Sequence, residues 1–269
     1  MRKHSPQGQI DKKTDSRNRD PNREHTKRAY VAAKLHPQDS VDCRGYLPMT
    51  CQEMDGLGWE RPDFVLVSGD AYVDHPSFGT AIIGRVLEAE GFKVAVLPQP
   101  NWQDAADFKR FGRPRLAFLV NSGVIDSMVN HYTAAKKPRS EDAYAPGNRA
   151  GQRPDRAVIV YTNCIREAYR NMPVILGGLE ASLRRFAHYD YWTDKVWRSL
   201  LADSGANLLV YGMGERAIVV IAPSLDACVP VETIDYVRRT AHLNATGEET
   251  GPRLDYNNRA RPNRVLPAV

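Results

Sequence analysis

The chain has 269 residues, of which 42% are hydrophobic and 26% charged, and its formal net charge is +5. This composition is enough for one sizeable core, and no apolar run approaches the about 20 residues that a membrane helix needs. The charged N-terminus lacks the apolar core of a signal peptide. We therefore expect a cytoplasmic protein with no membrane partner, whose modest positive charge permits contact with nucleic acid without indicating it.

Residues 1–40 are charged and polar, with almost nothing apolar before Tyr30. Such a segment cannot offset its ordering entropy by burial, so we predict a disordered basic tail. The alternative is an arm that contacts RNA or DNA.

The fold pattern is clearest between Phe64 and Leu97. Residues 64–67 form a short apolar run typical of a strand buried on both faces. Apolar residues at helical spacing follow, with Pro76 in the predicted first turn, Asp74 or His75 as its cap, and Gly91 closing the helix. Residues 92–97 then form a second strand. This strand–helix–strand unit builds parallel sheets.

The rest of the chain repeats this pattern. Thr50 and Glu53 have the spacing of a capping box for a short helix. Further strands are expected at 116–120, 174–176 and 207–211. We expect helices at 104–111, 125–132, 156–170, 179–186, 197–201 and 216–221, with a weak one at 234–239; residues 157–161 alone could pass for a strand. The predicted fold class is α/β, an open, mostly parallel Rossmann-like sheet with helices on both faces.

Three regions differ in composition from this pattern. Residues 133–156 are rich in Lys, Arg, Pro, Gly and Asn, which predicts a surface excursion of the main domain. The main domain is expected at 41–225, after the tail at 1–40. Residues 226–269 are polar from about Asn244 and are predicted to be weakly structured.

Several predicted strands end in polar or glycine-rich turns. In a parallel sheet these turns share one edge, where ligands bind at a switch point in strand order. Each glycine alone could serve only its own turn, but four turns together suggest a ligand site. The candidate ligand-binding residues in these turns are Ser68, Asp70, Ser77, Gly177, Gly178, Gly212, Gly214 and Glu215.

Other candidates carry charge or a titratable group. Asp74, His75 and Glu180 could do acid–base or ligating work, or could be caps and surface groups. Arg184 and Arg185, near His188, could bind a phosphate or carboxylate; the alternative is that they pair with acids such as Asp190.

The four cysteines are Cys43, Cys51, Cys164 and Cys228, and none forms a CxxC pair. Free thiols in a reducing compartment are the expected state, and the spacing predicts no metal site. No Ser/His/Asp motif or Walker loop is visible, so we assign no catalytic residue.

Several blocks of the sequence are specific enough to indicate a family. They are LPMT at 47–50, VSGDAYVDHPSFG at 67–79, GGLEASLRRFAHYDYW at 177–192 and YGMGE at 211–215. These blocks, within about 45–222, resemble the N-terminal domain of the YgiQ-type family of radical SAM proteins. The resemblance implies a Rossmann-type domain like the cobalamin-binding domain that precedes many radical SAM barrels.

The family's catalytic barrel carries a Cys-x-x-x-Cys-x-x-Cys motif that binds a [4Fe-4S] cluster and S-adenosylmethionine. This motif is absent here, so no cofactor is expected in this chain alone. The Asp-x-His-x-x-Gly corrinoid signature is only approximated by residues 74–79, which argues against cobalamin. We interpret the chain as a fragment, truncated product or split subunit that is inactive alone, with a radical SAM barrel as its partner.

Two other functions remain open at this point. One is a stand-alone module that binds a nucleotide- or corrinoid-type ligand. The other is a nucleic-acid-associated protein that uses its basic tail. The substrate, the reaction and the oligomeric state cannot be read from the residues.

Overall fold

The computed structural model describes residues 45–243, 249–250, 253–254 and 260–261. The predicted tail at 1–40 and Cys43 lie outside these residues, as does most of the chain after Leu243. Among the described residues, no helix is both long and apolar enough to cross a membrane.

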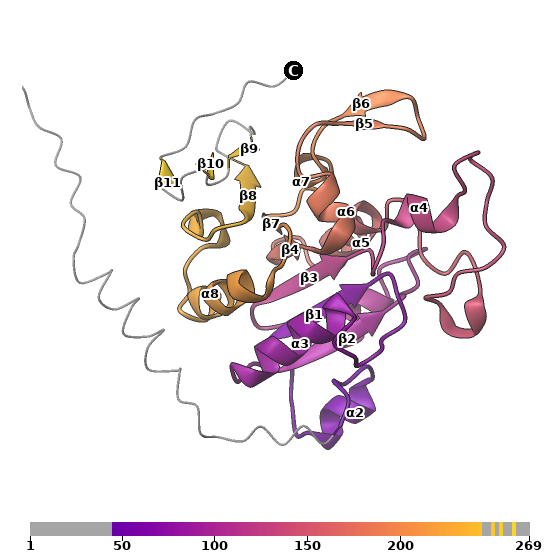
Figure 1. Cartoon of the computed structure of the whole chain (residues 1–269). Coiled ribbons are helices and arrows are strands. Elements are labelled where there is room, and N and C mark those ends of the chain that lie inside the picture. Colours follow the sequence, from indigo (N-terminus) through magenta and orange to yellow (C-terminus); the bar gives the residue numbers. More distant parts are fainter. Residues whose placement is uncertain (1–44, 244–248, 251–252, 255–259, 262–269) are drawn as a thin grey trace, which may run out of the picture. The chain divides into compact units, whose positions relative to one another are not determined.

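The described residues build a seven-stranded sheet in the order β2-β1-β3-β4-β7-β8-β9 (Figure 1). The first five strands in this order pair in parallel, and β8 and β9 add antiparallel. The expected α/β fold with a mostly parallel sheet is therefore confirmed. The strands are Phe64–Ser68 (β1), Val94–Pro98 (β2), Ala117–Asn121 (β3), Val174–Leu176 (β4), Leu208–Val210 (β7), Thr240–Leu243 (β8) and Glu249–Thr250 (β9).

Strand β1 lies between β2 and β3, and Leu66 pairs with Val96 on one side and Leu119 on the other. The chain first adds a strand on one side of β1 and then crosses to the other side. This change of direction between β1 and β3 is the topological switch point of the sheet, where ligands bind in open α/β folds.

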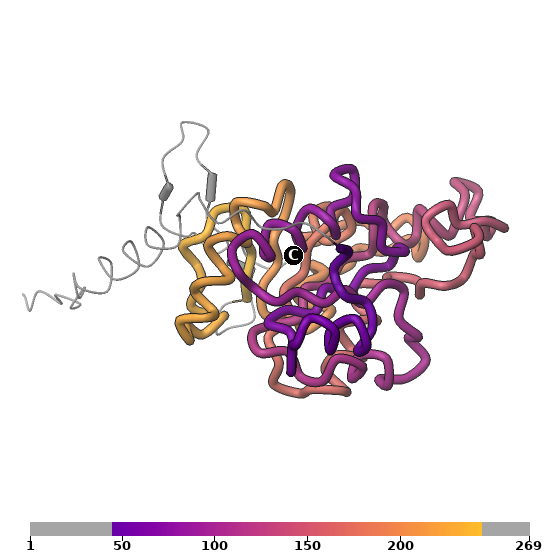
Figure 2. Tube along the Cα trace, turned by 90° about the horizontal axis from the view of Figure 1, so that it is seen from below, coloured from indigo at the N-terminus to yellow at the C-terminus, as the bar shows by residue number. Residues whose placement is uncertain are grey.

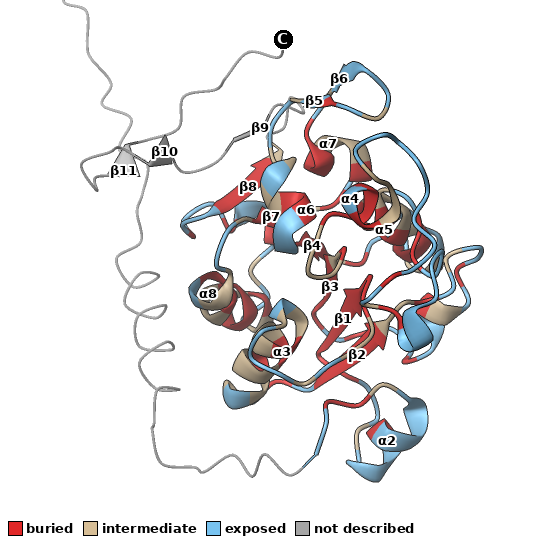
Figure 3. Cartoon of the chain, turned by 45° about the vertical axis from the view of Figure 1, so that its right-hand side comes forward, coloured by how far each residue is buried: buried red, intermediate tan, exposed pale blue. Residues whose placement is uncertain are grey.

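Alternate residues of each strand face opposite sides of the sheet, and both sides are buried. On one side, Val65 and Val67 join a core with the helices Ala157–Ala168 (α5) and Leu200–Ser204 (α7). On the other side, Leu66 and Leu119 join a core with Gly79–Ala89 (α3) and Glu215–Asp226 (α8). Figure 3 shows α3 and α8 as neighbours, each with its buried face toward the sheet.

Local signals place several helix ends correctly. The Thr50–Glu53 capping box is formed at the start of Cys51–Gly56 (α2), and Gly91 has a φ of 84° after α3. Segment 157–168 is a helix, as favoured over the strand alternative. The caps expected for α3 are wrong: the helix starts at Gly79, its N-cap residue is Phe78, and Asp74 pairs with Arg85 on the helix instead of capping it.

Other predicted elements differ from the structure. The helix expected at 104–111 is reduced to a 3₁₀ turn, Asp107–Lys109. Segment 197–201 is divided between the helix α7 and an antiparallel hairpin, His188–Asp190 (β5) with Lys195–Trp197 (β6). Helix α8 continues through Pro223, and the helix expected at 234–239 is not formed; a 3₁₀ turn, Val231–Thr233, precedes β8 there.

The excursion at 133–156 follows Ser127–His131 (α4) and projects to one side of the sheet (Figure 2). Most of its residues are exposed, and it contains one 3₁₀ turn, Pro146–Asn148. Four of its residues are buried, and two of these carry charge: Asp142 and Arg153 are 2% and 1% exposed. The excursion therefore contributes charged side chains to the interior.

Candidate ligand site at the carboxyl edge of the sheet

The turns that follow β1, β3, β4 and β7 lie at the same edge of the sheet, because these strands run in parallel. They enclose a cavity of about 440 Å³ that reaches between α3 and α8. Its inner wall is the side chains of four strands, Leu66, Leu119, Ile175 and Val210, and its helical walls include Ile83 and Ile218. The cavity therefore lies at the switch point, with an apolar interior and polar turns at one end.

Two of these turns pack so closely that they require glycine. A Cβ on Gly69 would lie 2.1 Å from the carbonyl oxygen of Ser122. A Cβ on Gly123, whose φ is 105°, would lie 2.1 Å from Oδ1 of Asp70. These glycines let the turns after β1 and β3 contact each other, which sets the position of Asp70 at the cavity.

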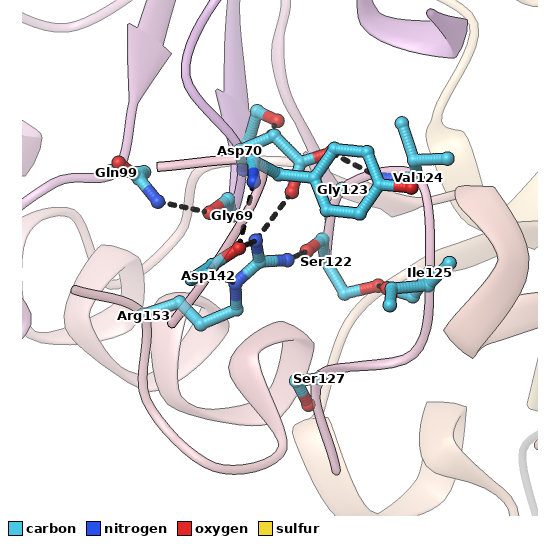
Figure 4. Close-up of polar contacts among 12 residues, drawn as sticks. Gly69, Asp70, Gln99, Ser122, Gly123, Val124, Ile125, Ser127, Asp142 and Arg153 are labelled. Carbon is cyan, nitrogen blue, oxygen red and sulfur yellow. Dashed lines mark hydrogen bonds and ion pairs between the residues drawn. The ribbon is translucent and has the colours of Figure 1, made fainter. Parts of the chain in front are cut away.

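Asp70 is part of a buried charge cluster (Figure 4). Nη2 of Arg153 lies 2.7 Å from Oδ1 of Asp70 and 2.9 Å from Oδ2 of Asp142, and Nη1 donates to the carbonyl of Ser122 at 2.8 Å. The backbone N–H of Val124 donates to Oδ2 of Asp70 at 2.6 Å. One guanidinium thus holds two carboxylates and the β3 turn together.

The cluster contains two acids and one base in a region that is almost closed to water. Burial raises the pKa of Asp70 above its ordinary value, and the nearby Arg153 charge opposes this increase. Asp70 is among the residues that line the cavity, so the lining includes an acidic residue whose side chain is fixed by two partners.

About half of the predicted site residues line the cavity. They are Asp70, Ser77, Gly177, Gly178, Gly212, Gly214 and Glu215. Ser68 lies directly behind the wall: its hydroxyl accepts from Thr80 Oγ1 at 3.2 Å and from the backbone N–H of Asp70 at 3.1 Å. Thr80 itself lines the cavity.

The remaining candidates are placed elsewhere. Asp74 is paired with Arg85 outside the cavity lining, and Nδ1 of His75 accepts from the N–H of Ser77 at 3.1 Å. The Arg184 guanidinium lies 2.8 Å from Oδ2 of Asp126.

The alternative of pairing with a nearby acid is therefore formed for Arg184, although the acid is Asp126; Asp190 pairs with Arg156 at 2.8 Å. The Arg185 guanidinium stacks over the rings of Phe186 and Tyr211.

Glu180, on Gly178–Leu183 (α6), is fully buried and holds helix starts together. Its Oε2 accepts from the backbone N–H of Ser127 at 2.9 Å and from its hydroxyl at 2.6 Å, and Oε1 accepts from the N–H of Val158 at 3.4 Å. Burial, with Asp126 nearby, raises the pKa of Glu180. These contacts connect α6 with the first turns of α4 and α5.

The sequence reading missed the two residues that fix Asp70. Arg153 and Asp142 lie in the excursion, 83 and 72 positions after Asp70, where no local pattern marks a charged side chain as buried. Their only signal is the length of the excursion, since long irregular loops in compact domains are usually functional or disordered.

The three cysteines in the described part of the chain do not fit an iron–sulfur cluster. Within the described residues, no group of three or more His, Cys, Asp or Glu side chains could hold a metal ion. Cys51 is exposed on α2, Cys228 is exposed in the turn after α8, and Cys164 is buried on α5 with its thiol facing the carbonyl of Trp102 at 3.6 Å. A [4Fe-4S] cluster needs several thiolates together, so this part of the chain offers no donor set for one.

Comparisons with known proteins agree with the sequence resemblance. A family model described as Radical SAM N-terminal matches residues 46–265. A UPF0313 protein of Clostridium botulinum strain 657 is 55% identical over 211 residues, which are 78% of this chain and 33% of that protein. UPF0313 proteins of Pseudomonas putida and Pseudomonas aeruginosa are each 52% identical over 233 residues, 86% of this chain and 30% and 31% of those proteins. The chain spans about a third of these relatives, and no solved structure gives a significant match.

Proposed function

This chain belongs to the radical SAM N-terminal family, and we propose that it acts as the ligand-holding, non-catalytic domain of a radical SAM enzyme. The observation that carries the proposal is the cavity at the switch point between β1 and β3. Preformed, mostly apolar cavities with a few fixed polar groups are the usual sites for small molecules. In this proposal the cavity holds part of a substrate whose identity the family does not give.

The chemistry is proposed to come from the part of the relatives that this chain does not span. Radical SAM enzymes use a [4Fe-4S] cluster and S-adenosylmethionine, and this chain lacks the Cys-x-x-x-Cys-x-x-Cys motif that holds the cluster in this family. The relatives are about three times as long as the matched segment, which leaves room for a catalytic barrel as the partner of this domain. We do not propose cobalamin as the ligand, because the imidazole of His75 makes a local contact and is not among the cavity residues.

Reconstitution of the [4Fe-4S] cluster tests whether this chain is catalytically inactive by itself. We expect the purified chain, incubated anaerobically with iron and sulfide, to take up no stoichiometric [4Fe-4S] cluster and to cleave no S-adenosylmethionine. A chimera in which this chain replaces the matching N-terminal third of the C. botulinum relative should take up the cluster. Cluster uptake and cleavage by the chain alone would overturn the assignment as a non-catalytic domain.

The same chimera tests the ligand-holding role. Gly214 lines the cavity with a φ of −86°, and a Cβ there would make only ordinary contacts, 3.5 Å from Val210 and 3.6 Å from Ile83. Gly214→Leu should fill the cavity and reduce turnover of bound substrate while leaving cluster content unchanged. Gly56→Leu adds the same side chain at an exposed glycine on α2 with no atom within 4 Å of its Cβ, and is the matched control.

A further inference from the structure

The cavity has a strong asymmetry between its body and its polar end. Apolar side chains from the strands, from both helices, from the loop before α3 and from the turn before α8 form the body; they include Val73, Phe78, Ile82, Ile83, Met213 and Ile218. Burying apolar surface there contributes roughly 25 cal/mol for each Å² removed from water. The cavity therefore favours a ligand with an apolar body.

The charged side chains that line the cavity are acidic. They are Asp70 and Glu215, and no Lys, Arg or His is among the described lining residues. Asp70 is paired with Arg153, but Asp142 shares that guanidinium, so the cluster keeps one excess negative charge. Glu215 is half-buried at the start of α8 and has no hydrogen-bond or ion-pair partner within the described part of the chain.

Two opposing contributions have to be weighed. Helices α3, α6 and α8 all start at the cavity, and each N-terminus acts like roughly half a positive charge. The guanidinium of Arg239 also lies near Gly212, but its side chain is exposed and screened by water. Three half-charges against Glu215 and the excess charge at Asp70 leave about half a net negative charge on the cavity lining.

Two neutral polar side chains of the wall, those of Asn121 and Thr80, already have partners within the protein. Oδ1 of Asn121 accepts from the N–H of Gly123 at 2.8 Å, and its Nδ2 donates to the carbonyl of Val67 at 3.2 Å. The hydroxyl of Thr80 donates to Ser68. Among the acidic side chains of the wall, the Glu215 carboxylate is therefore the acceptor left for a ligand.

We propose that the cavity selects uncharged or cationic small molecules, with an apolar body and a hydrogen-bond donor that reaches Glu215, over anionic and phosphate-bearing ones. This inference rests on the proposed ligand-holding function and specifies the class of ligand. According to this inference the cavity binds nucleotides poorly, although glycine-rich turns and helix N-termini at this edge of the sheet would by themselves favour phosphate.

Three indoles of matched shape test the charge preference: tryptamine (cation), 3-methylindole (neutral) and indole-3-propionate (anion). Each is titrated into the full chain by calorimetry at neutral pH. We expect tryptamine to bind at least as tightly as 3-methylindole and indole-3-propionate to bind most weakly. Glu215→Gln should weaken tryptamine about fivefold, the effect of losing one partly exposed charge pair, and should leave 3-methylindole unchanged.

Cavity-filling variants locate the binding. Gly214→Leu should abolish binding of all three indoles, and Ile83→Trp provides a second filling variant if the first does not fold; Gly56→Leu should bind as the unmodified chain does. Tightest binding of indole-3-propionate, or equal binding of all three, would overturn the charge inference and leave the ligand-holding function intact. Binding that persists in both filling variants, or no binding of any indole, would overturn the function itself.

Discussion

Arg153 is the residue on which the polar end of the cavity depends. Its side chain is fully buried and contacts Asp70, Asp142 and the carbonyl of Ser122. Charged groups inside a protein are tolerated when they are paired and hydrogen-bonded. Removing this one partner would leave two carboxylates facing each other without compensation.

We therefore predict that Arg153→Gln lowers the free energy of unfolding by about 3–5 kcal/mol, the usual cost of breaking a buried pair from one side. Urea unfolding followed by circular dichroism measures the change. Arg149→Gln, at an exposed position of the same excursion, is the control and should shift the free energy by less than about 0.5 kcal/mol. Equal effects of the two substitutions would show that the cluster does not stabilise the fold.

Glu180 should make stability depend on pH in a defined direction. Burial, with Asp126 nearby, raises its pKa in the folded state above the usual value near 4.5. Glu180 therefore holds its proton more tightly in the folded state than in the unfolded state. This difference stabilises the folded state at low pH, and the stabilisation is lost as the pH rises from about 4.5 toward the pKa of Glu180 in the folded state.

Because other carboxylates titrate too, the prediction concerns the difference between the unmodified chain and Glu180→Gln, which does not titrate. The free energy of unfolding of the unmodified chain minus that of the variant should fall between pH 4 and pH 8, measured by urea unfolding at each pH. Glu60→Gln, which removes an exposed carboxylate, serves as the control. A difference that rises with pH would contradict the assignment.

At the scale of the elements, the turns after β1 and β3 form one unit. Gly69 and Gly123 allow the backbone of one turn to contact the other, and Asp70 spans the contact through its bond from the N–H of Val124. The ends of the two central strands are therefore fixed together at the switch point.

Gly123→Ala should disturb this unit more than an ordinary glycine substitution. It combines a left-handed backbone with a Cβ that would lie 2.1 Å from Asp70. Gly91→Ala has a φ of 84° but no atom within 4 Å, so it reports backbone strain alone, of about 1–2 kcal/mol. We expect Gly123→Ala to lower the melting temperature further than Gly91→Ala, measured by calorimetry; equal shifts would mean that the turns adjust without cost.

Element boundaries were predicted well where the signal is local and poorly where distant contacts decide. The Thr50–Glu53 box and Gly91 act within one helical turn, and both were identified. The β5–β6 hairpin was missed: the ion pair of Arg156 with Asp190 and the stacking of Arg156 on Trp197 connect it to the end of the excursion.

At the scale of the whole molecule, the sheet order places strands from the start and the end of the domain around one cavity. Residues from β1, β3, β4 and β7, spread from Leu66 to Val210, share its wall. Helices α3 and α8 are more than 120 residues apart in the chain, yet they pack together to form its sides. The chain spans about a third of its relatives, so a catalytic barrel would be an addition to this domain rather than a part of it.

The fold class, the position of most strands and the family follow from the amino-acid sequence alone. A buried parallel strand is visible in the sequence as a continuous apolar run. A turn whose backbone requires glycine is visible as a glycine at that position. The sequence also determines that the turns after β1, β3, β4 and β7 share one edge, since this follows from parallel strands.

Which of the candidate side chains meet at that edge depends on how the chain folds in three dimensions. Asp70 and Glu215 line the cavity, whereas Glu180, Arg184 and Asp74 are held by partners elsewhere. Arg153 reaches Asp70 across 83 residues of sequence. Such contacts depend on how the chain crosses the sheet and on which charges become buried together, and neither is encoded in any short segment.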